Sequence, residues 1–188
     1  GLTEVVLLLI SNSVALNVVA KDRRTALMLP VEKGCAEEAL LFINNAVDLN
    51  AVNKDGNTAL MFACEKSHTE VALLLINNGA DLNAVNADGK TALMLASEKS
   101  HTEVALLLIN NGADLNAVSK NGNTALMLAC EKNHTEVALL LINNGADLNA
   151  VSKDGWTALL WACSKSLTEA ALLLINKGAD LNVVNENG

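Results

Sequence analysis

Short groups of apolar residues recur along the chain, two groups in every 33 residues. In residues 55–87 the first group is Ala59, Leu60, Phe62, Ala63 and Cys64, and the second is the six-residue apolar run 71–76. Both groups are flanked by polar residues, and their spacing places the apolar side chains on one side of a helix. The pattern therefore predicts two short helices in each stretch of 33 residues.

Polar residues at fixed offsets predict where these helices begin and end. Thr58 precedes the first helix, where its hydroxyl can accept a free backbone N–H group. Ser67 and Glu70 are three residues apart, which is the spacing of a capping box opening the second helix. Gly79 can adopt the left-handed backbone conformation that commonly ends a helix, so we expect the second helix to end just before it. Gly56 favours a tight turn before Thr58.

The same arrangement repeats from end to end of the chain. The Thr-Ala-Leu triplet begins at Thr25, Thr58, Thr91, Thr124 and Thr157. We divide the chain into the units 22–54, 55–87, 88–120, 121–153 and 154–186. Residues 1–21 match the second half of a unit, and residues 187–188 match the start of another. Because one such helix pair cannot bury its apolar side alone, we expect neighbouring units to stack about 8–10 Å apart.

This pattern resembles the ankyrin repeat over essentially the whole chain. The resemblance lies in the period of 33 and in the stretches D-G-x-T-A-L, S/N-H-T-E-V and N-G-A-D-L-N-A. It implies an all-α solenoid of stacked helix–turn–helix units with β-hairpin-like loops. It also implies a non-catalytic scaffold that binds a partner protein through a concave face of hairpin tips and first helices.

The chain departs from the ankyrin pattern at several positions. The family usually has Thr-Pro-Leu-His, whereas this chain has Thr-Ala-Leu-Met in four units, so apolar packing must replace the expected Thr–His hydrogen bonding. Unit 22–54 has Arg23 and Ala46 where the other units have Gly. It also has Pro30 inside the first helix, at a cost of up to about 3 kcal/mol. We therefore expect the N-terminal end to be the weaker one.

Composition and charge narrow the classes of partner. The 188 residues are 51% hydrophobic, which excludes a disordered chain, and the formal net charge is −8. That charge argues against nucleic acid or an anionic membrane as partner. The six-residue apolar runs are far shorter than the roughly 20 residues of a membrane span.

The cysteines and histidines are interpreted as structural residues, and no metal, cofactor or catalytic site is predicted. Cys64, Cys130 and Cys163 share one position, where they are expected to be buried thiols, too far apart for disulfides. Free thiols indicate a reducing, intracellular location, cytoplasmic or nuclear. The histidines at the start of the second helix repeat at His68, His101 and His134, too far apart to share a metal ion.

Two tryptophans in the last unit are the strongest candidates for partner binding. Trp156 replaces a polar residue at the hairpin tip, where a lone Trp has little folding role, and Trp161 replaces Phe or Leu on the first helix. Trp is enriched among the residues that dominate binding energy at interfaces. The other residues predicted to contact the partner are Lys153, Asp154, Lys165, Asn123, Glu131 and Lys132.

Two alternatives remain open from the sequence. The near-identical units also suit a structural spacer, or an engineered ankyrin scaffold with no natural partner. In addition, leucines recur on the second helix where a charged residue is common in such repeats. If these leucines are exposed, they form an apolar stripe through which the chain could weakly self-associate. They are Leu40, Leu73, Leu106, Leu139 and Leu172.

Overall fold

The computed structural model describes residues 4 and 20–182, and within them it contains five pairs of helices and no strand. The first helices are α2 (Met28–Glu32), α4 (Ala59–Glu65), α6 (Ala92–Glu98), α8 (Ala125–Glu131) and α10 (Ala158–Ser164). The second helices are α3 (Ala36–Ile43), α5 (Thr69–Asn77), α7 (Thr102–Asn110), α9 (Thr135–Asn143) and α11 (Thr168–Asn176). Most of the expected partial repeat 1–21, and all of residues 187–188, lie outside the described residues.

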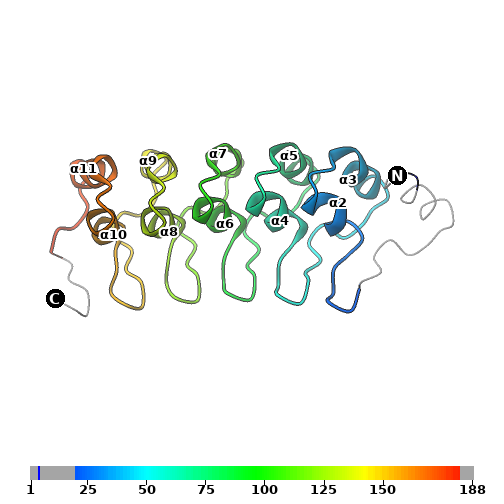
Figure 1. The fold of residues 1–188 in the computed structure, drawn as a ribbon, viewed down its shortest axis with the longest axis horizontal. Helices are drawn as coiled ribbons and strands as arrows, with labels where there is room; N and C mark the ends of the chain where they lie inside the picture. The colour runs from blue at the N-terminus through cyan, green and yellow to red at the C-terminus, as the bar shows by residue number, and fades with distance from the viewer. Residues whose placement is uncertain (1–3, 5–19, 183–188) are drawn as a thin grey trace.

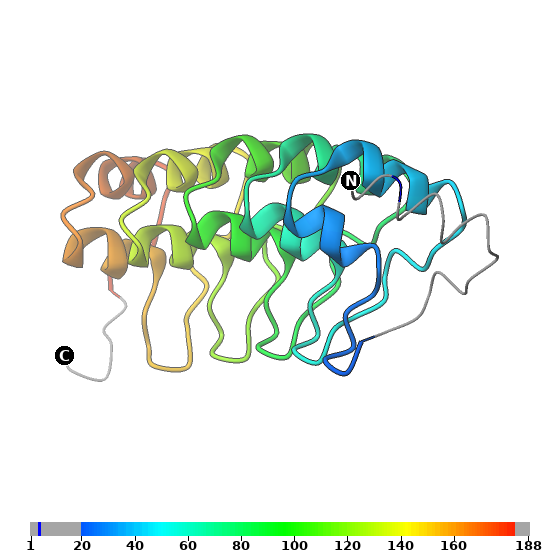
Figure 2. The same cartoon turned by 45° about the vertical axis from the view of Figure 1, so that its right-hand side comes forward.

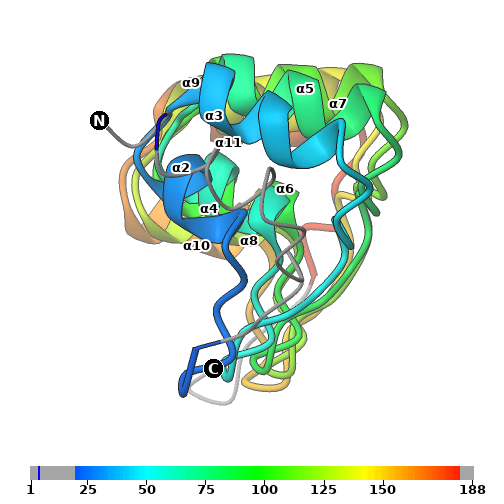
Figure 3. The ribbon, with the colours of Figure 1, turned by 90° about the vertical axis from the view of Figure 1, so that its right-hand side faces the viewer.

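The helices form two parallel rows, with hairpin loops projecting from one side (Figure 1). Each first helix packs on the first helices of its neighbours, and the second helices form the other row in the same order. Figure 2 shows the two rows obliquely, and the end view in Figure 3 shows the loops extending past the row of first helices. The predicted all-α repeat solenoid is confirmed. With nine residues in the longest of them, none of the described helices could span a bilayer.

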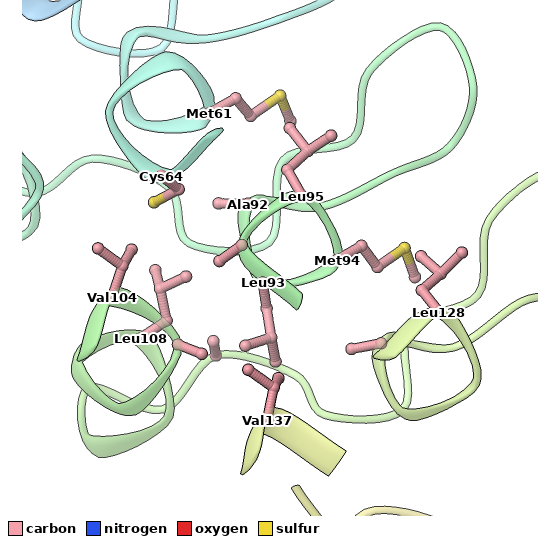
Figure 4. Packing of buried hydrophobic residues seen from close by; sticks show 14 of the residues in the cluster. Met61, Cys64, Ala92, Leu93, Met94, Leu95, Val104, Leu108, Leu128 and Val137 are labelled. Carbon is pink, nitrogen blue, oxygen red and sulfur yellow. The ribbon is translucent and has the colours of Figure 1, made fainter. Parts of the chain in front are cut away.

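The core lies between and along the two rows, and it is built mainly from Leu, Ala, Val and Met. Leu93 and Leu108, from the two helices of one unit, are fully buried, and the Leu93 side chain extends toward Val137 of the next unit (Figure 4). Met94 extends from α6 toward Leu128 of α8, as Met61 extends toward Leu95 one unit earlier. The methionine that replaces the family's histidine thus contributes the apolar packing between units that the sequence led us to expect.

Four of the five described first helices begin after a capping threonine, as predicted, but the predicted capping box of the second helix is wrong. Thr58 Oγ1 accepts a hydrogen bond from the Met61 N–H at 3.3 Å. Ser67 instead adopts a left-handed conformation with φ of 60°, and His68 occupies the N-cap position without a side-chain cap bond. Only three residues join α4 to α5, so Ser67 ends the first helix and cannot open the second. The His68 N–H donates to the Ala63 carbonyl at 2.9 Å, which completes that helix end.

Hydrogen bonds between units tie the loops of the solenoid together. In the hairpin turns, the Ala87 N–H donates to the Asp55 carbonyl at 2.8 Å, and the Lys120 N–H donates to the Asp88 carbonyl at 2.9 Å. A second row follows the second helices, where an asparagine Oδ1 accepts from the backbone N–H of an aspartate 31 residues later. Its members are Asn50–Asp81, Asn83–Asp114, Asn116–Asp147 and Asn149–Asp180, each at 2.8 Å.

The N-terminal unit accommodates its irregular residues at a structural cost. Helix α2 begins at Met28, two residues later than its counterparts, so Pro30 falls in the first turn. A missing N–H group is tolerated there, so the cost of Pro30 is lower than expected and appears as a shorter helix. Arg23 and Ala46 have φ of 61° and 55°. Residues other than Gly are strained in that region by roughly 1–2 kcal/mol.

One repeated position on the first helices shows how the C-terminal end of the array differs from its middle. Cys64 and Cys130 are completely buried, as predicted, whereas Cys163 is exposed, so that prediction was wrong. The shared position faces the next unit, and the described residues include no further helix to cover Cys163. In unit 88–120, Ser97 takes this position, and its buried hydroxyl has no hydrogen-bond partner.

The two buried thiols predict a loss of stability at alkaline pH. Burial raises the pKa of Cys130 to about 12, and it raises the pKa of Cys64 even further above the ordinary 9.0. Above pH 9 the unfolded chain therefore loses thiol protons that the folded chain keeps. We expect the free energy of unfolding to be unaffected by these groups below pH 9. It should fall by up to about 1.4 kcal/mol per pH unit for each thiol between pH 9 and 12.

Urea unfolding at pH 8, 9, 10 and 11 measures this dependence. The double variant Cys64→Ala/Cys130→Ala should be less stable at pH 8 but should lose stability less steeply above pH 9. Replacing the exposed Cys163 by Ala should not change how steeply the free energy of unfolding falls with pH above pH 9. Equal slopes for the double variant and the original chain would show that the buried thiols are not responsible.

Candidate protein-binding surface

The hairpin turns and the first helices share one surface, which we call the inner face. The third residue of each unit lies in the turn, and the eleventh lies at the end of the first helix. Arg24 Nη1 lies 2.8 Å from Glu32 Oε2, and Lys90 Nζ lies 2.7 Å from Glu98 Oε2. These ion pairs show that side chains from the turn and from the helix end meet on the same surface.

A depression in the inner face brings together three of the predicted contact residues. It lies between units 88–120 and 121–153 and has a volume of about 420 Å³. Asn123, Glu131 and Lys132 line it, together with the Lys90–Glu98 ion pair. Lys132 Nζ lies 2.9 Å from Glu131 Oε1, and this hydrogen bond raises the pKa of Lys132 above its ordinary value.

Trp156 and Trp161 form a stacked pair at the next unit. Their ring centroids are 4.0 Å apart, with 19° between the ring planes, and Lys165 Nζ lies 5.6 Å from the centroid of Trp161. Trp156 is therefore not the isolated side chain that the sequence suggested. Both rings are half-buried, and Trp161 packs against the core. The buried indole N–H of Trp161 has no partner among the described residues.

The remaining predicted contact residues, Lys153 and Asp154, lie at the tip of the hairpin that carries Trp156. Both are exposed, and the Lys153 N–H donates to the Asn121 carbonyl of the preceding unit at 2.9 Å. The Trp156 N–H donates to Ser152 Oγ at 3.0 Å, which holds the turn in shape. The eight predicted residues thus lie on one face of two adjacent units. They form the depression and, beside it, the aromatic pair with its hairpin tip.

The histidines join adjacent units, a role that the sequence reasoning did not identify. The Nε2 of His68 lies 3.1 Å from the Glu32 carbonyl oxygen, 36 residues earlier in the chain. His101 and His134 make the same contact one and two units further on. Since a carbonyl only accepts, Nε2 is the donor. No group of three or more potential metal ligands occurs among residues 4 and 20–182.

The leucine stripe on the second helices is exposed for most of its length. Leu40, Leu73, Leu106 and Leu172 are exposed, whereas Leu139 is half-buried. Leu139 and Leu172 line a shallow depression between α9 and α11. Self-association through this stripe stays a prediction.

Comparison with known proteins gives one match at the level of a family. A family model described as ankyrin repeats matches the chain in three copies, over residues 1–86, 38–119 and 107–185. None of the curated proteins compared with the chain matches it.

Proposed function

The chain belongs to the ankyrin-repeat family, whose members generally mediate protein–protein interaction, and we propose that it holds a partner protein on its inner face. In this proposal the inner face is the concave, partner-facing surface. Members of the family are typically non-catalytic, and we propose no enzymatic activity for this chain. The four free cysteines support an intracellular, reducing location.

The observation that carries the proposal is the aromatic pair at the hairpin of the last unit. Trp156 and Trp161 present two large rings that remain half-exposed after stacking on each other. The depression lined by Asn123, Glu131 and Lys132 lies one unit away. An aromatic anchor beside a polar rim is the usual composition of a binding hot spot.

A structural spacer without a partner remains the second candidate, but the variation between units favours binding. The buried positions are nearly constant, whereas the half-buried position in the hairpin turn changes from one unit to the next. Its occupants are Arg24, Asn57, Lys90, Asn123 and Trp156. A spacer has no need for different side chains at that position, whereas a surface that recognises one partner does.

Replacing Trp156 by Ala tests the proposal. We expect the change to weaken capture of the partner by at least about 1 kcal/mol, roughly fivefold in affinity, because it removes one of the two rings of the aromatic pair. The free energy of unfolding should change little. Saturable capture from a cell lysate on immobilised protein, followed by titration of the captured partner, measures the effect.

Two further variants serve as controls for this experiment. Trp156→Asn introduces the residue found in units 55–87 and 121–153, so it preserves the turn and should weaken capture as Ala does. Lys177 follows α11, away from the inner face, so the variant Lys177→Ala should leave capture of the partner unchanged. Unchanged affinity for both Trp156 variants would reject the assignment of the site.

A further inference from the structure

Charge is distributed unevenly between the two sides of the solenoid. Within residues 20–182, twelve of the thirteen Lys and Arg residues belong to the hairpin turns and the ends of the first helices, against eight carboxylates there. In the same range, the second helices and the loops that follow them carry eleven carboxylates and a single cation, Lys177. The inner face is therefore net positive, although the chain as a whole has a formal net charge of −8.

A row of lysines runs along the inner face at one position of each unit. They follow the first helices and are all exposed: Lys33, Lys66, Lys99, Lys132 and Lys165. Among the described residues, the ion pairs of this face involve Arg24, Lys90 and Lys132. Lys66 and Lys99 have no carboxylate within ion-pair distance among residues 4 and 20–182, so their charges are available to a ligand.

We propose that the inner face binds an extended, acidic segment of a partner protein, with an apolar side chain of that segment seated on Trp156. The inference rests on the proposed function and adds the chemistry of the partner. Carboxylates of the segment would pair with the lysine row, and the apolar side chain would cover the exposed ring of the Trp156–Trp161 pair.

The spacing of the row sets the spacing of the acidic residues. Packed helices lie about 8–10 Å apart, and an extended chain advances about 3.3 Å per residue. Three residues of an extended segment therefore span about the distance between adjacent units, so a carboxylate at every third residue can meet one lysine in each unit. Five lysines correspond to a segment of about 13–15 residues.

The other charges of the molecule favour an acidic protein segment over a nucleic acid. The eight carboxylates of the inner face are interleaved with its cations, as Glu98 is with Lys90 and Lys99. The unbroken charge of a nucleic-acid backbone would meet these carboxylates, whereas carboxylates at every third residue can avoid them. At physiological ionic strength the Debye length is about 8 Å, so a bound segment interacts mainly with the inner face and little with the acidic second helices.

Synthetic peptides test the proposal directly. The probe is a fluorescent 15-residue Gly/Ser peptide with Glu at every third position and Phe at one end, made in both orientations. We expect one orientation to bind at least tenfold more tightly than its counterpart with Lys in place of Glu. It should also bind more tightly than a peptide with the same five Glu in one block. Equal binding of the Lys peptide, or no binding of the Glu peptides at 1 mM, would overturn the proposal.

Two variants with the same change in net charge locate the effect. Lys66→Gln/Lys99→Gln and Lys177→Glu each make the chain more negative by two charges. We expect the double variant to weaken binding of the acidic peptide about fivefold or more, and Lys177→Glu to weaken it less than twofold. Equal effects would show that overall charge, and not the lysine row, controls binding.

The remaining outcomes separate this inference from the proposed function. Tighter binding of a dT15 oligonucleotide than of the acidic peptides would overturn the inference in favour of a nucleic-acid ligand. If the peptides fail while capture of a partner still depends on Trp156, the inference is wrong and the proposed function stands. If capture is also insensitive to Trp156, both are wrong.

Discussion

Replacing Leu108 by Ala is expected to lower the free energy of unfolding by about 3 kcal/mol. The Leu108 side chain is 0% exposed and lies in the core of the middle unit, on the same helix as the buried Val104 (Figure 4). Truncation removes apolar contacts and leaves a cavity that the surrounding helices cannot fill without losing contacts of their own. Because each unit is stabilised by its neighbours, a weakened middle unit also reduces the coupling between the two halves of the chain.

The neighbouring Leu106 provides a matched control on the same helix. Its side chain is 41% exposed, so Leu106→Ala should cost less than about 1 kcal/mol. Urea unfolding followed by circular dichroism measures both variants, and a broader transition for Leu108→Ala would report the reduced coupling. A similar cost for the two substitutions would contradict the packing described for the core.

Gly89→Ala is expected to lower the free energy of unfolding by about 3 kcal/mol, because Gly89 lies in a hairpin turn that closely contacts the turn of the next unit. Gly89 has φ of +72°, which strains any other residue by roughly 1–2 kcal/mol. An added Cβ would also lie 2.8 Å from the Lys120 backbone nitrogen of the next unit. That nitrogen donates to the Asp88 carbonyl, so the hairpins would have to separate at the hydrogen bond that joins them.

Gly112→Ala separates the two contributions. Gly112 has φ of +85°, but an added Cβ meets no atom within 4 Å, so only the backbone strain of about 1 kcal/mol is expected. The difference of about 2 kcal/mol between the variants, measured by urea unfolding, reports the close approach of adjacent hairpins. Equal losses for Gly89→Ala and Gly112→Ala would show that the hairpins are not in contact in solution.

Much of the candidate site could be located from the sequence, but its internal geometry could not. Trp156 was identified because it interrupts a repeated polar position, and Trp161 because it enlarges a repeated apolar one. Their spacing alone did not show that the two rings stack, since stacking depends on how the hairpin folds back on the first helix. The charge of the inner face follows from repeat positions, yet only the three-dimensional arrangement shows which lysines remain unpaired.

The sequence by itself determined the helix pairs, their period and the order in which they stack, because every unit carries the same apolar pattern. A threonine also caps the first helix in the four units from 55 to 186, as Thr58 does. Tertiary structure decided the role of Ser67, which ends one helix because the connection to the next is so short. It also decided that His68 binds the Glu32 carbonyl of the preceding unit and that Cys163 is exposed. These features depend on contacts across a turn or between stacked units, and a pattern within one unit does not specify them.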